Sequence, residues 1–410
     1  MTFVSTARPT PQRVLSPTDL ASARDGAACD VAGRVLHVGS DHVVLADAFA
    51  ECRIECASPK FQLGSWVVLR CRWRLDEWHI ERLLTQHPGS LHPAGQRVHT
   101  RHRAALLAKR QAAERMVRDY FDGQNFVEVH TPLRVAAPGT DVYVEPHRTQ
   151  NGWLITSPEF HLKRLLTGGM PRIYEFAVCT RNDEAGLWHQ PEFILLEWYR
   201  AFAEMEALFD DTEQLISLLA RQLCDAPVVR RAELMQELTP PFERLTVREA
   251  FRRYAGVDDV CDLADSDEDA YFQLLVDRVE PALRRHQKPV FLYDYPISQA
   301  ALARRKPEDS RIAERCELYL LGVELCNAYV ELTDPFEQRH RFERDRQMRQ
   351  RRQLPDLPID EGLLAALNEG MPPAAGNALG FERLLALLLG VALEDVIAFP
   401  KASHAFTRTG

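Results

Sequence analysis

Short alternating runs of apolar and polar residues fill the first part of the chain, at a spacing typical of strands. Positions 1–27 are rich in Pro, Ser, Thr and Ala without a clear period, so we expect a mostly disordered or loosely packed lead. Five strand-like runs follow within 28–95, at 31–36, 42–45, 52–56, 65–74 and 78–84. Closely spaced short strands of this kind predict a small barrel.

Helical spacing begins near residue 96. Apolar residues recur at helical positions over 100–121, where Gly123 is placed to end the helix, and again over 203–223. Strand-like runs are found further along, at 126–132, 141–146, 152–156, 172–179, 193–198 and 291–295. A chain of 410 residues is long enough for two domains. We therefore expect a small β domain at 28–95 and a larger domain at 96–410.

The runs at 172–179 and 193–198 flank a polar, Gly-containing loop, which predicts a long antiparallel hairpin. This loop is too charged to be only a turn, since it contains Arg181, Asp183, Glu184 and His189. Arginine suits bidentate contact with phosphate and stays charged at any working pH. The acids can receive an amine or reach a metal ion. The hairpin loop is therefore a candidate site for phosphate chemistry.

Composition and charge narrow the classes of protein. The net charge of −9 argues against broad nucleic-acid binding by electrostatic steering alone, although a local basic site stays possible. The nine cysteines form no C-x-x-C pair and no zinc spacing, which favours reduced structural thiols in a cytoplasmic protein. We find no signal peptide and no apolar run of about 18 or more residues, so neither secretion nor membrane spanning is indicated.

Several ordered motifs resemble one known family. The segments 181–184 (RNDE), 189–193 (HQPEF) and 197–199 (EWY) resemble motif 2 of class II lysyl-tRNA synthetases. They are closer still to the short relatives of those enzymes, the elongation factor P β-lysine ligases. The segment 156–159 (TSPE), followed by 163–165 (KRL), also matches these ligases. The resemblance covers roughly the last three-quarters of the chain.

This resemblance implies an α+β fold, with a class II synthetase-like antiparallel sheet flanked by helices. Lysyl-tRNA synthetases carry an OB-fold ahead of that sheet, so the segment 28–95 is expected to be a small OB-like β-barrel. The short ligases usually lack such a domain, and its presence is a departure from their pattern. The helix and strand over 100–132 resemble motif 1, which forms the dimer interface in the family. The resemblance thus implies a homodimer.

The resemblance also implies ATP and Mg²⁺ as cofactors. It places Arg181 on the α-phosphate and Arg383, in a motif 3-like Gly380-x-x-Arg383 segment, toward the γ-phosphate, and both are candidate catalytic residues. A substrate carboxylate attacking the α-phosphorus would build negative charge that arginine and magnesium can stabilise. The implied ATP-binding residues are Arg181, Asn182, Asp183, Gln190, Glu324, Leu325, Gly380 and Arg383. Two of them depart from the family pattern, because Asp183 replaces the usual Glu and Gln190 the usual Asn.

Two glutamates are the candidate metal ligands. Glu324 and Glu331 lie seven residues apart, an odd spacing that would place them on opposite faces of an uninterrupted strand. A bulge or turn at Asn327-Ala328 would be needed to bring them together. The resemblance implies that both lie near the ATP phosphates and magnesium, which prefers carboxylate and phosphate oxygens.

The amino-acid pocket is implied by the same resemblance, with Ser157, Pro158, Glu159, Tyr199, Glu331 and Ala378 as its residues. Ser157 stands where lysyl-tRNA synthetases usually have Ala, and Ala378 stands where they usually have Gly. A methyl group at Ala378 would reshape the pocket floor, which suits a shifted amine such as that of (R)-β-lysine. We therefore expect lysine or β-lysine to be activated as an aminoacyl-adenylate and transferred to a lysine side chain of elongation factor P.

Two other functions remain open. A tRNA-charging lysyl synthetase is supported by the extra N-terminal domain, but residues 1–95 hold ten acidic and ten basic side chains, so tRNA is an unlikely partner. In that domain Arg70, Arg72 and Arg74 alternate along one run, either as a nucleic-acid stripe or as a solvated strand face. A silent sensor is the third alternative. The Arg-dense helix at 339–352 fits a docking face or a solvated surface equally well.

Overall fold

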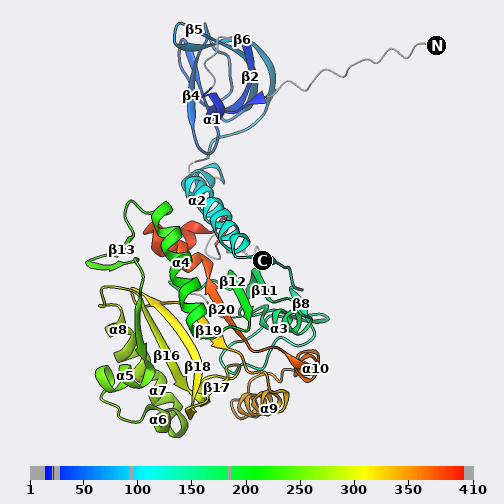
Figure 1. The fold of residues 1–410 in the computed structure, drawn as a ribbon. Coiled ribbons are helices and arrows are strands. Elements are labelled where there is room, and N and C mark those ends of the chain that lie inside the picture. The colour runs from blue at the N-terminus through cyan, green and yellow to red at the C-terminus, as the bar shows by residue number, and fades with distance from the viewer. Residues whose placement is uncertain are drawn as a thin grey trace, which may run out of the picture. The chain divides into compact units, whose positions relative to one another are not determined.

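The computed structural model describes residues 14–20, 22, 28–92, 96–182, 184 and 186–400. The chain divides into two compact units, Met1–Ala108 and Lys109–Gly410 (Figure 1). The expectation of a small domain at 28–95 and a larger one at 96–410 places the boundary after residue 95, whereas the units divide after Ala108. The helix α2, Gln96–Gly123, runs across both positions and ends at the predicted Gly123.

The first unit is a six-stranded sheet that closes on itself. Strand β5 pairs with both β2 and β6, and the order is β1-β2-β3-β4-β6-β5. The elements are β1 (Val14–Leu15), α1 (Pro17–Leu20), β2 (Ala28–Val38), β3 (His42–Ala46), β4 (Glu51–Glu55), β5 (Trp66–Arg74) and β6 (Glu77–His87). All five strand-like runs of the sequence become strands, and their inward residues, Val31, Val43 and Leu69 among them, are fully buried.

Residues 14–20 of the expected lead form regular elements. Strand β1 pairs in parallel with β2, and Leu20 of α1 is 2% exposed within the barrel core. Ser16 and Asp19 begin α1 by hydrogen bonding to each other, so polar capping rather than an apolar period marks this element. The remainder of the lead lies largely outside the described residues.

The arginines of β5 are ion-paired within the barrel. Arg70 contacts the Asp30 carboxylate, Arg72 lies 2.6 Å from Glu81, and Arg74 lies 3.4 Å from the same Glu81. Each positive charge on this strand thus faces an acid of the barrel, and no net positive field results. This arrangement favours the solvated strand face over the nucleic-acid stripe.

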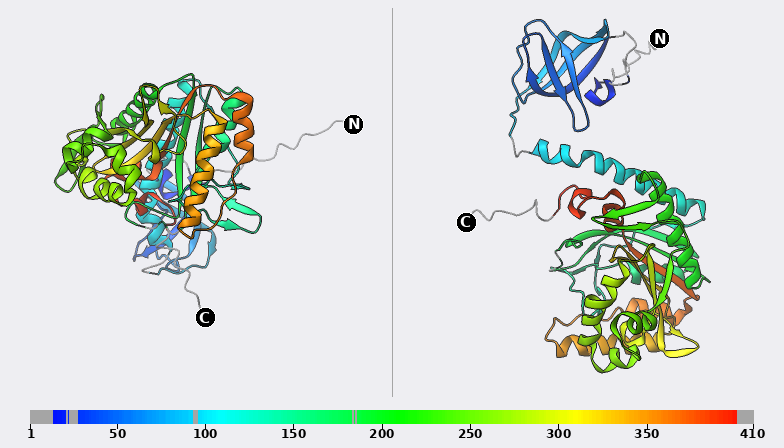
Figure 2. Two further views of the ribbon diagram at one scale, coloured as in Figure 1. Left: turned by 90° about the horizontal axis from the view of Figure 1, so that it is seen from below. Right: turned by 90° about the vertical axis from the view of Figure 1, so that its left-hand side faces the viewer.

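The second unit is built on a nine-stranded, mostly antiparallel sheet with helices packed against it (Figures 1 and 2). Its order is β15-β16-β18-β19-β20-β12-β11-β7, with β17 pairing β18. The strands are β7 (Val127–Glu128), β11 (Arg172–Thr180), β12 (Glu192–Ala201), β15 (Glu243–Thr246), β16 (Val290–Pro296), β17 (Arg305–Lys306), β18 (Asp309–Leu320), β19 (Val323–Val330) and β20 (Ala374–Gly380). The predicted hairpin is the β11–β12 pair, whose nine-residue register runs from Arg172↔Arg200 to Thr180↔Glu192.

Helices and smaller sheets complete the second unit, and α9 and α10 run side by side in Figure 2. The helices are α3 (Glu159–Thr167), α4 (Met205–Leu223), α5 (Val247–Ala250), η1 (Phe251–Ala255), α6 (Val260–Ser266), α7 (Glu268–Leu274), η2 (Leu275–Val279), α8 (Glu280–Leu283), η3 (Ile297–Gln299), α9 (Pro335–Arg351), α10 (Glu361–Gly370), α11 (Phe381–Leu389) and η4 (Leu393–Val396). The smaller sheets hold β8 (Arg134–Val135), β9 (Arg148–Thr149) and β10 (Gly152–Leu154), and β13 (Val228–Arg231) and β14 (Leu234–Glu237). The main core lies where α4 and α11 cover the sheet, around Trp198, Leu215 and Leu384.

Two strand predictions were too generous. Only Val127–Glu128 of 126–132 is a strand, and 141–146 is an irregular segment. Here the fully buried Arg349 of α9 donates to the carbonyl oxygens of Asp141 and Val144, at 2.6 and 3.4 Å, and to the Glu145 carboxylate at 2.6 Å. A side chain thus replaces a strand as the partner of this backbone.

The Arg-dense helix α9 was expected to be either a solvated helix or a docking face, but part of it is buried. Arg341 and Arg349 are 4% and 1% exposed and hold backbone carbonyls of other segments, including those of Ala300 and Ala303. Among the described residues all nine cysteines are free thiols, and no described helix is long and apolar enough to cross a membrane.

Candidate active site

A cavity of about 280 Å³ opens over the centre of the large sheet. Strands β12, β20 and β19 form its floor, and the register lines up their side chains in rows. Glu197 pairs with Ala378, which in turn pairs with Asn327, and all three line the cavity. Because side chains alternate across a strand, the next row on the same face is Tyr199, Gly376 and Tyr329.

Gly376 lets two functional side chains approach the same point. A Cβ atom built there would lie 2.2 Å from Cε1 of Tyr199 and 2.7 Å from Oε1 of Glu331, both too close for a real contact. Any larger residue at this position would therefore push Tyr199 or Glu331 aside. Gly376 thus has a steric role beside the pocket, because its missing side chain leaves room for Tyr199 and Glu331.

A β-bulge at Leu325 decides where Glu324 of β19 lies relative to Glu331, which follows the end of that strand. Leu318 of β18 pairs with Cys326, but the next residue, Tyr319, pairs with Glu324, so Leu325 is an extra residue. Glu324 is thereby returned to the cavity face, which Asn327 also lines. The expected interruption exists, but it lies at Leu325 and not at Asn327-Ala328.

Two arginines mark one end of the cavity. Arg383, at the start of α11, donates from Nε to the Trp188 carbonyl at 2.9 Å and from Nη1 to the Glu324 carbonyl at 3.0 Å. Arg181 lies over the Phe193 ring, 5.2 Å from its centroid, and 3.8 Å from the Glu184 carboxylate. Both guanidinium groups line the same cavity, as a phosphate site requires.

Carboxylates gather beside the floor around one buried lysine. The Lys163 ammonium of α3 lies 2.6 Å from Glu159 and 2.6 Å from Glu331, and its side chain is 1% exposed. Burial alone would lower the Lys163 pKa, but the two carboxylates together raise it. Burial raises the pKa of Glu331, and the Lys163 ammonium opposes that rise. Lys163 therefore stays charged and holds both carboxylates in place.

Glu197 is a third carboxyl in this pocket and was missed as a site residue. It is fully buried, accepts a hydrogen bond from the Ser157 hydroxyl at 2.7 Å, and accepts another from Tyr199 at 3.2 Å. Burial, reinforced by the Glu159 charge, raises the Glu197 pKa to about 8. The one signal that could have found it is strand alternation, which places Glu197 on the same face as Tyr199, two residues later.

Most of the predicted site residues meet around this one cavity. Its lining includes Ser157, Glu159, Arg181, Gln190, Glu324, Leu325, Ala378, Gly380 and Arg383. Tyr199 and Glu331 lie behind the lining residues. Tyr199 contacts Glu197, and Glu331 contacts Lys163. Pro158 precedes α3, and the Asn182 N–H donates to the Glu145 carbonyl at 2.8 Å. Asp183 lies outside the described residues.

The two predicted metal ligands have different surroundings. The Glu324 side chain is 43% exposed, whereas Glu331 is ion-paired with Lys163. Desolvation, reinforced by the Glu317 charge, raises the Glu324 pKa, and the nearby arginines oppose that rise. Among the described residues no group of three or more His, Cys, Asp or Glu side chains could hold a metal alone. Magnesium usually takes one or two carboxylates together with substrate phosphates. The donor set around Glu324, beside the two arginines, fits that pattern, and Glu331 does not.

Comparisons with known proteins agree with this geometry. The family model for class II tRNA synthetases (D, K and N) matches residues 96–403. The "Elongation factor P--(R)-beta-lysine ligase" of Proteus mirabilis (strain HI4320) is 40% identical over 326 residues, which is 72% of this chain and 95% of that protein. The protein of the same name from Yersinia enterocolitica serotype O:8 / biotype 1B (strain NCTC 13174 / 8081) gives the same identity and coverage. The barrel strands β2 to β6 precede the matched family region.

Proposed function

Since this chain belongs to the class II tRNA synthetase family (D, K and N), we propose that it is an ATP-dependent ligase acting on a lysine-type amino acid. It activates (R)-β-lysine, or lysine, as an aminoacyl-adenylate and transfers it to a lysine of elongation factor P. One observation carries this proposal: a single cavity joins an arginine pair with a carboxylate cluster around Glu197. A diamino acid presents a carboxylate at one end and an amine at the other, so it matches both ends.

Arg181 and Arg383 act on the phosphate end of the reaction. The amino-acid carboxylate attacks the α-phosphorus of ATP, and pyrophosphate leaves. Arg181 stabilises the negative charge that develops on the α-phosphate, and Arg383, fixed by the Trp188 and Glu324 carbonyls, holds the far phosphates. No protein nucleophile is required, because the two substrates supply the reacting groups and the site supplies their alignment.

Magnesium is proposed as the cofactor at this end. When bound it would neutralise phosphate charge, and Glu324 would hold it, with Glu317 as an acidic neighbour. Glu331 is better suited to the amino-acid pocket, where it completes the group of carboxylates with Glu159 and Glu197. These three carboxyl groups can accept hydrogen bonds from the amines of the substrate.

The amine pocket contains the two positions that favour β-lysine over lysine. Ser157 donates to Glu197 and so sets the position of that carboxylate. Ala378 lies between Glu197 and Asn327 in the cavity floor, where its methyl group occupies space below an amine. Ser157 and Ala378 thus both lie next to Glu197, the carboxyl group that the shifted amine of β-lysine would contact.

Elongation factor P as the acceptor rests on the similarity to the two named ligases, which extends over 95% of each. We propose a cytoplasmic location because such an acceptor is a translation factor. We also propose that unit one is an OB-like barrel and that two copies of the chain associate through the β7 edge, where Val127 is 50% exposed. The specific alternative is tRNA charging, which the additional barrel favours and its paired arginines oppose.

An acceptor assay tests the proposal. The purified protein, ATP, magnesium and labelled lysine or (R)-β-lysine are offered elongation factor P and, separately, bulk tRNA. We expect label on elongation factor P, strongest with β-lysine. Label on tRNA alone would replace the proposal by tRNA charging. Absence of amino-acid-dependent ATP–pyrophosphate exchange would favour a silent sensor.

A further inference from the structure

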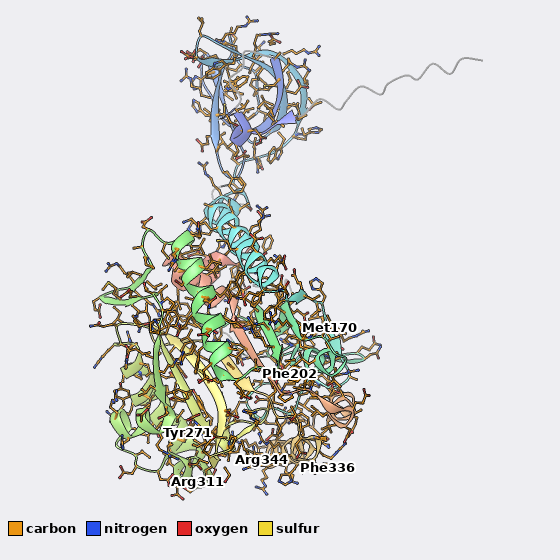
Figure 3. All side chains as sticks on the ribbon, in the orientation of Figure 1. Met170, Phe202, Tyr271, Arg311, Phe336 and Arg344 are labelled. Atoms are coloured by element: carbon orange, nitrogen blue, oxygen red, sulfur yellow. The ribbon has the colours of Figure 1, made fainter. Side chains whose placement is uncertain are left out.

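One wall of the cavity is not used by the residues described so far. It is formed by Thr140 and Asp141, in the segment that Arg349 holds, and by Asp345 on α9. Thr140 is 3% exposed, and its hydroxyl has no hydrogen-bond partner among the residues that the structure describes. Asp345 is 6% exposed, and its carboxylate has its sequence neighbour Arg344 at 3.5 Å as an ion-pair partner. Figure 3 labels Arg344 on this part of the second unit.

The buried carboxyl group of this wall, Asp345, has little positive charge around it. Burial raises the Asp345 pKa to about 6, the Arg344 guanidinium opposes that rise, and the nearby Asp141 carboxylate adds to it. Arg341, the other nearby guanidinium, is engaged by Glu337 and by two backbone carbonyls. Burying a carboxylate and a hydroxyl with so few partners is costly unless a ligand completes them. A cationic group that donates hydrogen bonds would complete both.

Two aromatic rings lie beside the same wall. Phe160 of α3 and Phe342 of α9 both line the cavity, and their ring centroids are 5.5 Å apart. Such a surface packs against a methylene chain and attracts a positive charge at its end. A lysine side chain combines the two properties, whereas an inorganic cation has no apolar stem.

We propose that Thr140, Asp345, Phe160 and Phe342 form the subsite for the lysine side chain of the protein acceptor. This inference rests on the proposed function and adds to it the place where the second substrate enters. The amines of the activated amino acid already have Glu159, Glu197 and Glu331. The end of a tRNA carries phosphates, which Asp141 and Asp345 would repel. The same cavity holds both subsites, as an attack of the acceptor nitrogen on the activated carbonyl requires.

The transfer step is balanced as follows. The acceptor ε-ammonium, held by Asp345 and Thr140, releases one proton to solvent and thereby gains a lone pair. The amine nitrogen attacks the acyl carbon of the adenylate, and a C–N bond forms. The bond between the acyl carbon and the phosphate oxygen breaks, and AMP leaves with its electron pair. The nitrogen loses a second proton, and the amide remains. Asp345 orients the amine and takes no part in bond making.

Separate assays of the two half-reactions test the subsite. ATP–pyrophosphate exchange with lysine or (R)-β-lysine reports activation, and labelling of elongation factor P reports transfer. For Asp345→Asn we expect unchanged exchange and a loss of transfer kcat/KM of about tenfold or more, as expected when a hydrogen bond to a charged group is removed. The matched control is Glu343→Gln, an exposed acid two residues earlier on the same helix, which should retain both reactions.

A second pair of variants does not depend on how well Asp345→Asn folds. Thr140→Val keeps the shape of the residue and removes its hydroxyl, so transfer should fall about fivefold or more while exchange holds, and Thr140→Ser should restore transfer. Normal transfer by Thr140→Val, or equal losses in both half-reactions, overturns the subsite. A raised KM for lysine in exchange assigns the wall to the amino acid and also overturns it. Failure of the unmodified protein in exchange, or its transfer to tRNA alone, would instead contradict the proposed function.

Discussion

The Ser157 hydroxyl donates a hydrogen bond to the Glu197 carboxyl across 2.7 Å. Ser157 comes from the segment before α3, and Glu197 from the centre of β12, so the contact joins two distant parts of the chain. It ties the hydroxyl of Ser157 directly to a buried acid that lines the cavity. Under the proposed function, the protonation of that acid is linked to amino-acid binding.

Amino-acid binding should release a proton from Glu197. Its pKa is about 8 in the unliganded protein, and a substrate ammonium would favour the carboxylate form. Affinity for lysine should thus rise as the pH approaches 8 and level off above it. Calorimetry in two buffers of different ionisation enthalpy measures the proton. Glu197→Gln should bind more weakly and lose the buffer dependence. A binding enthalpy that is the same in both buffers for the unmodified protein would contradict this mechanism.

The same group makes the unliganded protein less stable as the pH rises. The folded-state pKa of about 8 lies above the usual value of 4.5, so the folded state holds the proton more tightly. The stability that this adds is fully present below pH 4.5 and is lost as the pH rises toward 8. Urea unfolding at several pH values should show a smaller dependence between pH 5 and 8 in Glu197→Gln.

Gly376→Ala should damage the amino-acid pocket. The new Cβ would meet Tyr199 at 2.2 Å and Glu331 at 2.7 Å, so one of them must move. We expect the KM for lysine in exchange to rise by about tenfold or more, because displacement of a positioned group by about 1 Å is costly. Gly123→Ala is the control, because a Cβ at the end of α2 has nothing within 4 Å. The same KM for lysine in both variants would contradict a steric role for Gly376.

Glu324 and Glu331 should have separable effects. Glu324 lies beside Arg383, so Glu324→Gln should raise the magnesium concentration needed for half-maximal exchange. Glu331 lies beside Lys163, so Glu331→Gln should raise the KM for lysine and leave the magnesium dependence unchanged. Magnesium titrations at saturating lysine distinguish the two. A shifted magnesium requirement in Glu331→Gln would restore it as a metal ligand.

Ala378→Gly should change amino-acid preference. The methyl group lies between Glu197 and Asn327, and its loss opens space in the pocket floor. The ratio of kcat/KM for (R)-β-lysine to that for lysine should fall, while a strand glycine costs about 1 kcal/mol of stability. Exchange rates with the two amino acids give the ratio directly. An unchanged ratio would count against Ala378 as the selective residue.

Arg349→Met should destabilise the second unit by about 3 kcal/mol or more, since it removes a buried charge from Glu145 and from two carbonyls. Urea denaturation measures the change in the free energy of unfolding. Arg351→Met, an exposed position of the same helix, should have an effect below about 0.5 kcal/mol. Similar losses in both variants would show that Arg349 is no more important than a surface arginine.

Regular features of the fold could be predicted from the sequence, because alternation and helical spacing reflect burial along a single element. The β11–β12 hairpin and the end of α2 at Gly123 are examples. Elements held by side chains could not be predicted in this way. The segment that Arg349 holds has the apolar alternation of a strand, but its carbonyls accept hydrogen bonds from a guanidinium 208 and 205 residues later.

The candidate site was predicted through motifs, and its omissions have physical reasons. Arg181 and Arg383 are separated along the chain but line one cavity, as the motif order implied. Glu197 has no signal of its own, because a buried acid within a long apolar strand is evident only when Ser157 and Tyr199 are seen beside it. Thr140 and Asp345 belong to no motif and meet only through tertiary structure.

The bulge at Leu325 has a consequence for how the chain can vary. Leu325 contributes to the site mainly as one extra residue of backbone between Glu324 and Cys326. Replacement of its side chain by another apolar one leaves the count of residues intact, whereas deletion would turn Glu324 away from Arg383 and into the core. Position 325 is therefore open to substitution, whereas the strand around it is closed to changes of length.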